Sequence, residues 1–138
     1  MTGVQTCALP IYQGQRDGMP VYYGNIGDQS ILSAAHVERA SLMLITINST
    51  AAALRAVTLV RNAYPTVPIV CRAHDLKASG ELLAAGATHA HPETIESSLR
   101  LSALALEMIA VPEDNVEALL ESVRKRNYEL VAPCKAEE

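Results

Sequence analysis

The amino-acid sequence predicts an α/β fold in which helices flank a parallel sheet. Short apolar runs of strand length alternate with segments of about 10 to 15 residues that have helical periodicity, a pattern typical of βαβ units. The run at 42–47 (LMLITI) is apolar almost throughout, as expected for a strand covered on both faces. Of the 138 residues, 49% are hydrophobic and 19% are charged, which is the composition of one globular domain.

The first regular elements follow Pro20. Residues 21–23 (VYY) are β-prone and are closed by Gly24, so we expect a short strand there. Asp28 can cap a helix that continues to Ala35, because its carboxylate can accept a hydrogen bond from a free amide of the first turn.

The strand at 42–47 is followed by a helix. Ser49 or Thr50 can cap this helix, and apolar residues then recur at helical spacing. The helix is expected to end before Pro65, because the residue ahead of a proline is disfavoured in the helical conformation.

The strand and helix pattern then repeats. Residues 69–73 (IVCRA) are expected to form a second buried strand, and residues 75–85 a helix with Gly86 as its left-handed C-terminal residue. A short strand is expected at 87–91.

The last part of the chain is predicted to be mainly helical. The helix at 92–109 is apolar around much of its circumference, more than one sheet face can cover. We therefore expect its residues 94–109 to pair with a second copy in a homodimer. Pro112 suits the first position of an amphipathic helix, and residues 128–131 are expected to add a final strand.

Composition limits the possible partners. There are 11 Lys and Arg against 15 Asp and Glu, and the net charge of −4 gives no support to a nucleic-acid partner. No apolar run approaches the roughly 18 residues needed to span a bilayer, so we expect no direct membrane insertion. Cys7, Cys71 and Cys134 have no metal-ligand spacing and fit reduced thiols in a cytosolic protein.

Polar residues lie at the ends of three expected strands, where parallel sheets bind ligands. They are Gly24 and Asn25 after the first strand, Asn48 after the second and Arg72 in the third. Asparagine can hydrogen-bond to a ribose or an adenine edge, and Arg72 can hold a phosphate. The alternative is that the asparagines are turn and cap residues, and that Arg72 neutralises a buried carboxylate.

The residues alone give little support for catalysis or for a metal site. Neither GxGxxG nor GxxxxGK[ST] occurs anywhere in the sequence. His89 and His91 are expected to point to one face of a strand, but a third ligand at a suitable spacing is missing. Cys71 lies in an apolar strand, which favours a core residue over a nucleophile.

Several short motifs occur in order between about residues 18 and 128. They are VYYG at 21–24, IL and AA within 31–35, ERA at 38–40, LITIN at 44–48, VR at 60–61 with Pro65, PIVCRA at 68–73, GA at 86–87 and PETIESSL at 92–99. In combination they resemble the nucleotide-binding regulatory domain of bacterial potassium transport systems. This is the TrkA-N or RCK N-terminal domain, and the version fused to Kef-type potassium/proton antiporters is the most similar.

The resemblance implies a Rossmann-like regulatory domain that binds NAD(H) or AMP, dimerises and controls a potassium transporter without being an enzyme. Carried over by position, Gly24, Asn25, Asn48 and Arg72 are the nucleotide-binding residues. Asn25 replaces the aspartate usual in the family, which removes a charge. The implied partner is the membrane transporter domain of the intact protein, and the implied location is cytoplasmic, at the inner membrane.

The first β-α-β unit of the family, with its glycine-rich turn, has no counterpart in this sequence. We expect the sheet to lack two central strands, which lie between those at 21–23 and 42–47 in the usual strand order, and nucleotide binding to be impaired. Residues 1–11 (MTGVQTCALPI) resemble a translated sequencing adapter, and a natural flexible tail is the alternative.

Three regions are therefore expected: a disordered or artefactual segment at 1–18, a partial TrkA-N domain at 19–110, and a helix, short strand and tail at 111–138. Two other functions stay open as alternatives, the cofactor half of an NAD-dependent oxidoreductase and a stand-alone TrkA-like potassium uptake subunit. A catalytic residue downstream would favour the oxidoreductase, but residues 92–138 contain only helical core patterns and charged surface.

Overall fold

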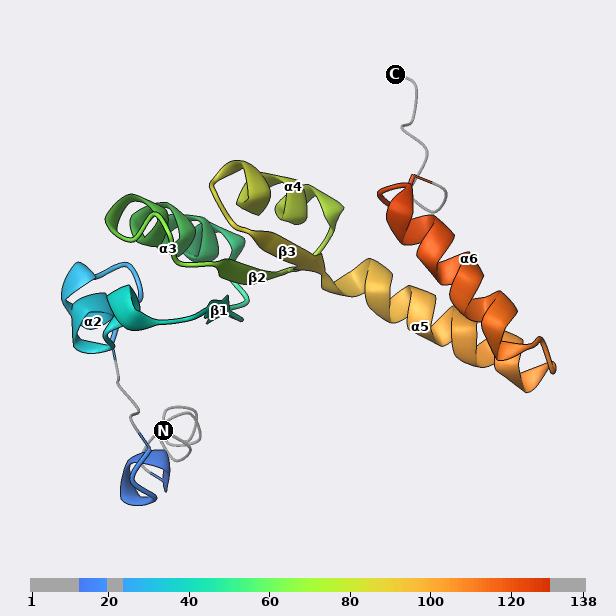
Figure 1. Ribbon diagram of the computed structural model, residues 1–138, viewed down its shortest axis with the longest axis horizontal. Helices are drawn as coiled ribbons and strands as arrows, with labels where there is room; N and C mark the ends of the chain where they lie inside the picture. The colour runs from blue at the N-terminus through green and yellow to red at the C-terminus, as the bar shows by residue number, and fades with distance from the viewer. Residues whose placement is uncertain (1–12, 20–23, 130–138) are drawn as a thin grey trace, which may run out of the picture. The chain divides into compact units, whose positions relative to one another are not determined.

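The computed structural model describes residues 13–19 and 24–129 (Figure 1). They divide into two compact units, one reaching His91 and the other starting at Pro92. The strand expected at 21–23 and the adapter-like segment lie outside the described residues. The domain boundaries expected after residues 18 and 110 stay predictions.

The first unit is built on a three-stranded sheet with the order β1-β2-β3. The strands are β1 (Met43–Ile45), β2 (Ile69–Ala73) and β3 (His89–Pro92). β1 pairs with β2 in parallel, with Met43 opposite Ile69 and Ile45 opposite Cys71. The predicted α/β fold is confirmed, and β1 is shorter than the apolar run at 42–47.

Residues 24–91 contain the α-helices α2 (Gln29–Ala34), α3 (Thr50–Ala63) and α4 (Leu76–Ala84), and the 3-10 helix η1 (Val37–Arg39). Each of these α-helices begins at a cap that the sequence supplies, whereas η1 has no side-chain cap. Asp28 accepts from the N–H of Ser30, and Asp75 accepts from the N–H of Ala78. Ser49, not Thr50, caps α3 by accepting from the N–H of Ala52. These side chains satisfy amides that have no partner within the helix.

Helices cover one face of the sheet in the described part of the chain. Figure 1 shows α3 and α4 side by side over the same face of the strands, and both contact β2. Along β2, Ile69, Cys71 and Ala73 are buried against these helices, whereas Val70 and Arg72 are only half-buried. Leu44 of β1 is 62% exposed. The expectation that the strand at 42–47 is covered on both faces is therefore wrong for the described residues.

Arg61 of α3 connects the amino-terminal ends of β2 and β3. Its Nε donates to the carbonyl of Gly86 at 2.9 Å, and its Nη1 donates to the carbonyls of Pro65 at 2.6 Å and Val67 at 3.2 Å. Its Nη2 lies 3.4 Å from Oγ1 of Thr88. One side chain thus fixes the two loops that lead into these strands.

Gly86 has the left-handed backbone that its position after α4 predicted. Its φ is +109°, and a Cβ atom added there would lie 2.9 Å from Cγ of Arg61. Only glycine fits this combination of backbone angle and close approach.

The second unit is a helical hairpin of α5 (Glu93–Met108) and α6 (Glu113–Lys125). The buried residues on these helices are Leu99 and Ala103 on α5, and Val116 and Val123 on α6. No helix in the described ranges is long and apolar enough to cross a membrane.

Two sequence expectations for this unit differ from the structure. Pro112 is the residue before α6 and not its first helical residue. Residues 126–129 form a turn, in which Asn127 and Tyr128 have φ of 50° and 64°, so no strand begins at Tyr128. The rest of the strand expected at 128–131 lies outside the described residues.

Candidate functional site

The structure brings together two of the four residues expected to bind nucleotide. Nη2 of Arg72 donates a hydrogen bond to Oδ1 of Asn48. Asn48 lies just beyond the carboxyl end of β1, and Arg72 lies near the carboxyl end of β2. Adjacent parallel strands end at the same edge of a sheet, and ligands of open α/β sheets bind at this edge.

The geometry of this pair leaves both side chains accessible. Side chains alternate between the two faces of a strand, and the neighbours of Arg72, Cys71 and Ala73, are buried against the helices. Arg72 therefore leaves β2 on the uncovered face. Its guanidinium offers several donors in one plane, and Asn48 offers an amide that can both donate and accept.

The start of α3 adds a favourable field beside Asn48. Ser49 caps this helix, and Asn48 is the residue before the cap. The amino-terminal end of a helix carries partial positive charge and favours an anionic group nearby. The edge formed by Asn48, Arg72 and the first turn of α3 can hold a ribose or adenine edge together with a phosphate.

Gly24 and Asn25 have local structural roles. Oδ1 of Asn25 accepts from the N–H of Gly27 at 2.9 Å, which makes the turn before Asp28. A Cβ atom on Gly24 would lie 2.4 Å from Cδ1 of Ile31, so a larger residue there would require the Ile31 side chain to shift.

The histidines and Cys71 form no reactive cluster in the described part. The rings of His89 and His91 lie with centroids 6.4 Å apart on β3. The described residues hold no group of three or more His, Cys, Asp or Glu that could bind a metal ion. Cys71 is fully buried, and burial raises the pKa of its thiol, so the thiolate is disfavoured.

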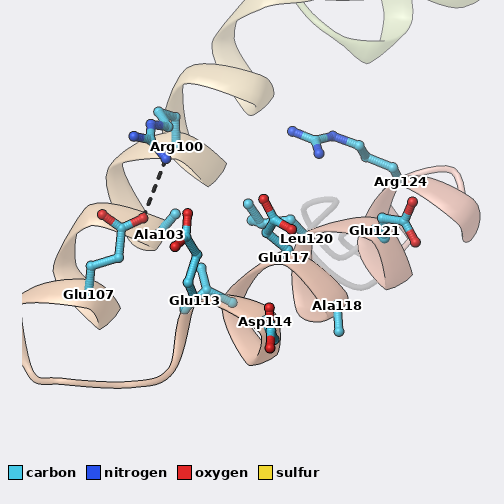
Figure 2. A pocket seen from close by; sticks show the side chains of 11 residues that line it. Arg100, Ala103, Glu107, Glu113, Asp114, Glu117, Ala118, Leu120, Glu121 and Arg124 are labelled. Atoms are coloured by element: carbon cyan, nitrogen blue, oxygen red, sulfur yellow. Dashed lines mark hydrogen bonds and ion pairs between the residues drawn. The ribbon is translucent and has the colours of Figure 1, made fainter.

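A groove between α5 and α6 was not expected from the sequence. Figure 2 shows charged side chains along it, including Arg100 of α5, which lies 3.5 Å from Glu107. Glu113 and Asp114 line it in the first turn of α6, where the helix dipole stabilises carboxylates. Glu121, also in the lining, pairs with Lys125 at 2.9 Å. These charged side chains are typical of a solvated surface, and they do not indicate a particular ligand for the groove.

Comparison with known proteins identifies close similarity to potassium-efflux proteins. K(+) efflux antiporter 2, chloroplastic, of Arabidopsis thaliana is 32% identical over 124 residues, which cover 89% of this chain and 11% of that protein. The glutathione-regulated potassium-efflux system protein of Haemophilus influenzae is 30% identical over 112 residues, which cover 81% of this chain and 18% of that protein. The chain thus spans only a small part of the curated relatives it matches.

A solved structure and a family description agree with these relatives. The structure titled Shewanella denitrificans Kef CTD in AMP bound form superposes with a TM-score of 0.70 at 29% identity, covering 80% of this chain and 73% of that one. The family described as the TrkA-N domain matches residues 10–92, more than half of the sequence. The chain therefore belongs to the TrkA-N domain family.

Proposed function

We propose that this chain is a regulatory domain that binds an adenine nucleotide, NAD(H) or AMP, and controls a Kef-type potassium/proton antiporter. The contact between Arg72 and Asn48 at the carboxyl edge of the sheet carries this proposal. The AMP-bound state named for the similar Kef domain supports the nucleotide class, and the potassium-efflux relatives support the transporter. In this proposal the domain acts by binding the nucleotide, and none of its residues carries out a catalytic step.

The proposed partner is the membrane part of a potassium transporter, at the cytoplasmic face of the inner membrane. The relatives that match this chain are much longer and are named as efflux proteins, which supports this assignment. The domain would report nucleotide binding to the ion pathway.

We propose that this chain by itself binds nucleotide weakly, with a Kd of about 1 mM, which corresponds to about −4 kcal/mol. The sequence has no glycine-rich loop to hold a pyrophosphate, so its backbone offers no cradle of that type. Oδ1 of Asn25 accepts a hydrogen bond from Gly27 within its own turn, and a nucleotide contact of Gly24 and Asn25 stays a prediction.

Titration with AMP, followed by heteronuclear NMR, tests the site. Saturable shifts are expected at the amides of Asn48, Ser49 and Arg72. Arg72→Ala is expected to weaken binding about tenfold or more, because a hydrogen bond to a charged group contributes roughly 1.5 to 3 kcal/mol.

The matched control is Arg55→Ala on the exposed side of α3, which should leave the titration unchanged. Shifts centred elsewhere would contradict the site. A micromolar Kd with the same shifts would contradict only the weak affinity.

We further propose that α5 mediates a homodimer through an apolar stripe of Leu101, Leu104 and Met108. These side chains recur at helical spacing and are 69%, 42% and 87% exposed. Large apolar side chains gathered on one exposed helix face are typical of an interface.

Sedimentation equilibrium tests the dimer. Leu101→Glu is expected to weaken dimerisation about 30-fold or more, since loss of a central apolar side chain typically costs about 2 kcal/mol or more. Leu83→Glu, at a position 47% exposed on α4, is the control and should leave the dimer intact. A chain that is monomeric at all concentrations would contradict the proposal.

A further inference from the structure

The carboxylate of Glu96, in the first turn of α5, accepts hydrogen bonds from the far end of α6. Arg124 donates from Nε to Oε1 at 3.0 Å and from Nη2 to Oε2 at 2.7 Å, which is a bidentate pair. The hydroxyl of Tyr128 donates to Oε1 at 2.7 Å. The side chain of Glu96 is only 11% exposed and that of Arg124 is 46% exposed, so the carboxylate is the shielded member of the pair.

The turn that carries Tyr128 has an unfavourable backbone. Asn127 and Tyr128 have φ of 50° and 64°, a left-handed conformation that non-glycine residues rarely adopt. The N–H of Tyr128 donates to the carbonyl of Val123 at 2.9 Å, and its hydroxyl donates to Glu96. The turn is thus held partly by a residue at the beginning of the hairpin.

The bond from Tyr128 persists at neutral pH. Burial, together with the hydrogen bond to the carboxylate of Glu96, raises the pKa of Tyr128 to about 12. The phenol therefore keeps its proton and remains a donor.

The apolar contact within the hairpin is small. Its buried helix positions are Leu99 and Ala103 on α5 and Val116 and Val123 on α6, none larger than a leucine. The loop between Met108 and Glu113 joins the helices at one end of the hairpin. The polar contact at Glu96 lies at the opposite, open end, where no covalent link holds α6.

We infer that Glu96, Arg124 and Tyr128 form a latch that closes the open end of the hairpin, and that α6 with its terminal turn is released as one unit when the latch opens. Arg124 and Tyr128 donate to the same carboxylate, whose side chain is 11% exposed, so loss of either donor weakens the hold of Glu96 on the end of α6. Glu96 lies four residues after Pro92, the last residue of β3. The latch therefore links the start of α5 to the end of α6.

Hydrogen–deuterium exchange on the whole 138-residue chain tests the latch. Glu96→Gln keeps the shape of the side chain and removes its charge. We expect the amides of 113–129 to exchange about tenfold faster or more. Exchange in α3 should be unchanged, because local opening is confined to one cooperative unit.

Two milder variants should accelerate exchange by a smaller amount. Arg124→Lys keeps the charge and loses the planar fork, and Tyr128→Phe removes only the hydroxyl. Each is expected to accelerate exchange at 113–129 by about threefold, less than Glu96→Gln. If Glu96→Gln does not fold, an Arg124→Lys effect confined to these residues supports the latch, and no effect overturns it.

Glu117→Gln is the matched control, because Glu117 is exposed on α6 and undergoes the same chemical change. The amides of 113–129 in this variant should exchange at the same rate as in the unaltered chain. Equal exchange in the Glu96 and Glu117 variants would overturn the latch. Equal acceleration in α3 and at 113–129 would overturn release of α6 as a separate unit.

Discussion

Replacement of Gly86 by alanine is expected to lower the free energy of unfolding by about 2 to 4 kcal/mol. Two costs add at this position. A φ of +109° is strained for any residue with a Cβ atom, and the new methyl group would lie 2.9 Å from Cγ of Arg61. Arg61 cannot easily move away, because its guanidinium is bound to the loops before β2 and β3.

The same substitution at Gly80 supplies the control with the opposite sign. Gly80 lies inside α4, and a Cβ atom there would have no heavy atom within 4 Å. Gly80→Ala is therefore expected to stabilise the chain by about 1 kcal/mol through helix propensity. Urea denaturation measures both variants, and a neutral Gly86→Ala would contradict the proposed strain.

Arg61→Ala is expected to destabilise the chain by about 2 to 3 kcal/mol, because removal of a charged donor leaves part-buried carbonyls without a partner. The affected carbonyls are those of Gly86 and Val67, at 2.9 Å and 3.2 Å from the guanidinium. Arg61→Lys should recover only part of the loss, because an ammonium group cannot reach both loops at once.

Thermal and urea unfolding of Arg61→Ala and Arg55→Ala provide the measurement. Arg55 lies on the exposed side of the same helix, so its loss should change stability by no more than about 0.5 kcal/mol. If the two variants lose equal stability, the contribution of Arg61 is general charge and not its bonds to the loops.

Much of the first unit could be predicted from the sequence because its helices carry their own start and stop residues. Asp28 and Asp75 cap helices, and Gly86 ends one, through contacts within a few residues in the chain. Contacts of this short range can be predicted from the neighbouring residues in the sequence. By residue type, Ser49 and Thr50 could each cap the next helix. The structure places the cap at Ser49, whose backbone is extended.

The covering of the sheet could not be predicted in the same way. An apolar run such as 42–47 indicates that both faces of a strand are apolar. It does not indicate whether helices cover the second face of the sheet. Leu44, 62% exposed, is the result in the described residues. Tyr128 is a similar case, because it is β-prone in sequence but lies in a turn, with a φ of 64°.

At the candidate site, topology predicted that Asn48 and Arg72 lie together, and their binding of a nucleotide stays a prediction. Asn48 and Arg72 meet because they end adjacent parallel strands, which the order of elements predicted. Asn25 is bound in its own turn, as the alternative interpretation had it. The contacts of Arg61 with Gly86 and of Glu96 with Tyr128 join residues more than twenty positions apart, and no periodic pattern marks such pairs.

Burial of Cys71 has a consequence for thiol chemistry in this molecule. The sulfur lies at the centre of the sheet with no exposed surface, and its environment opposes ionisation. An alkylating reagent can reach it only while β2 is separated from α3 and α4. The rate at which Cys71 is labelled therefore measures how often the core opens, without any probe being introduced.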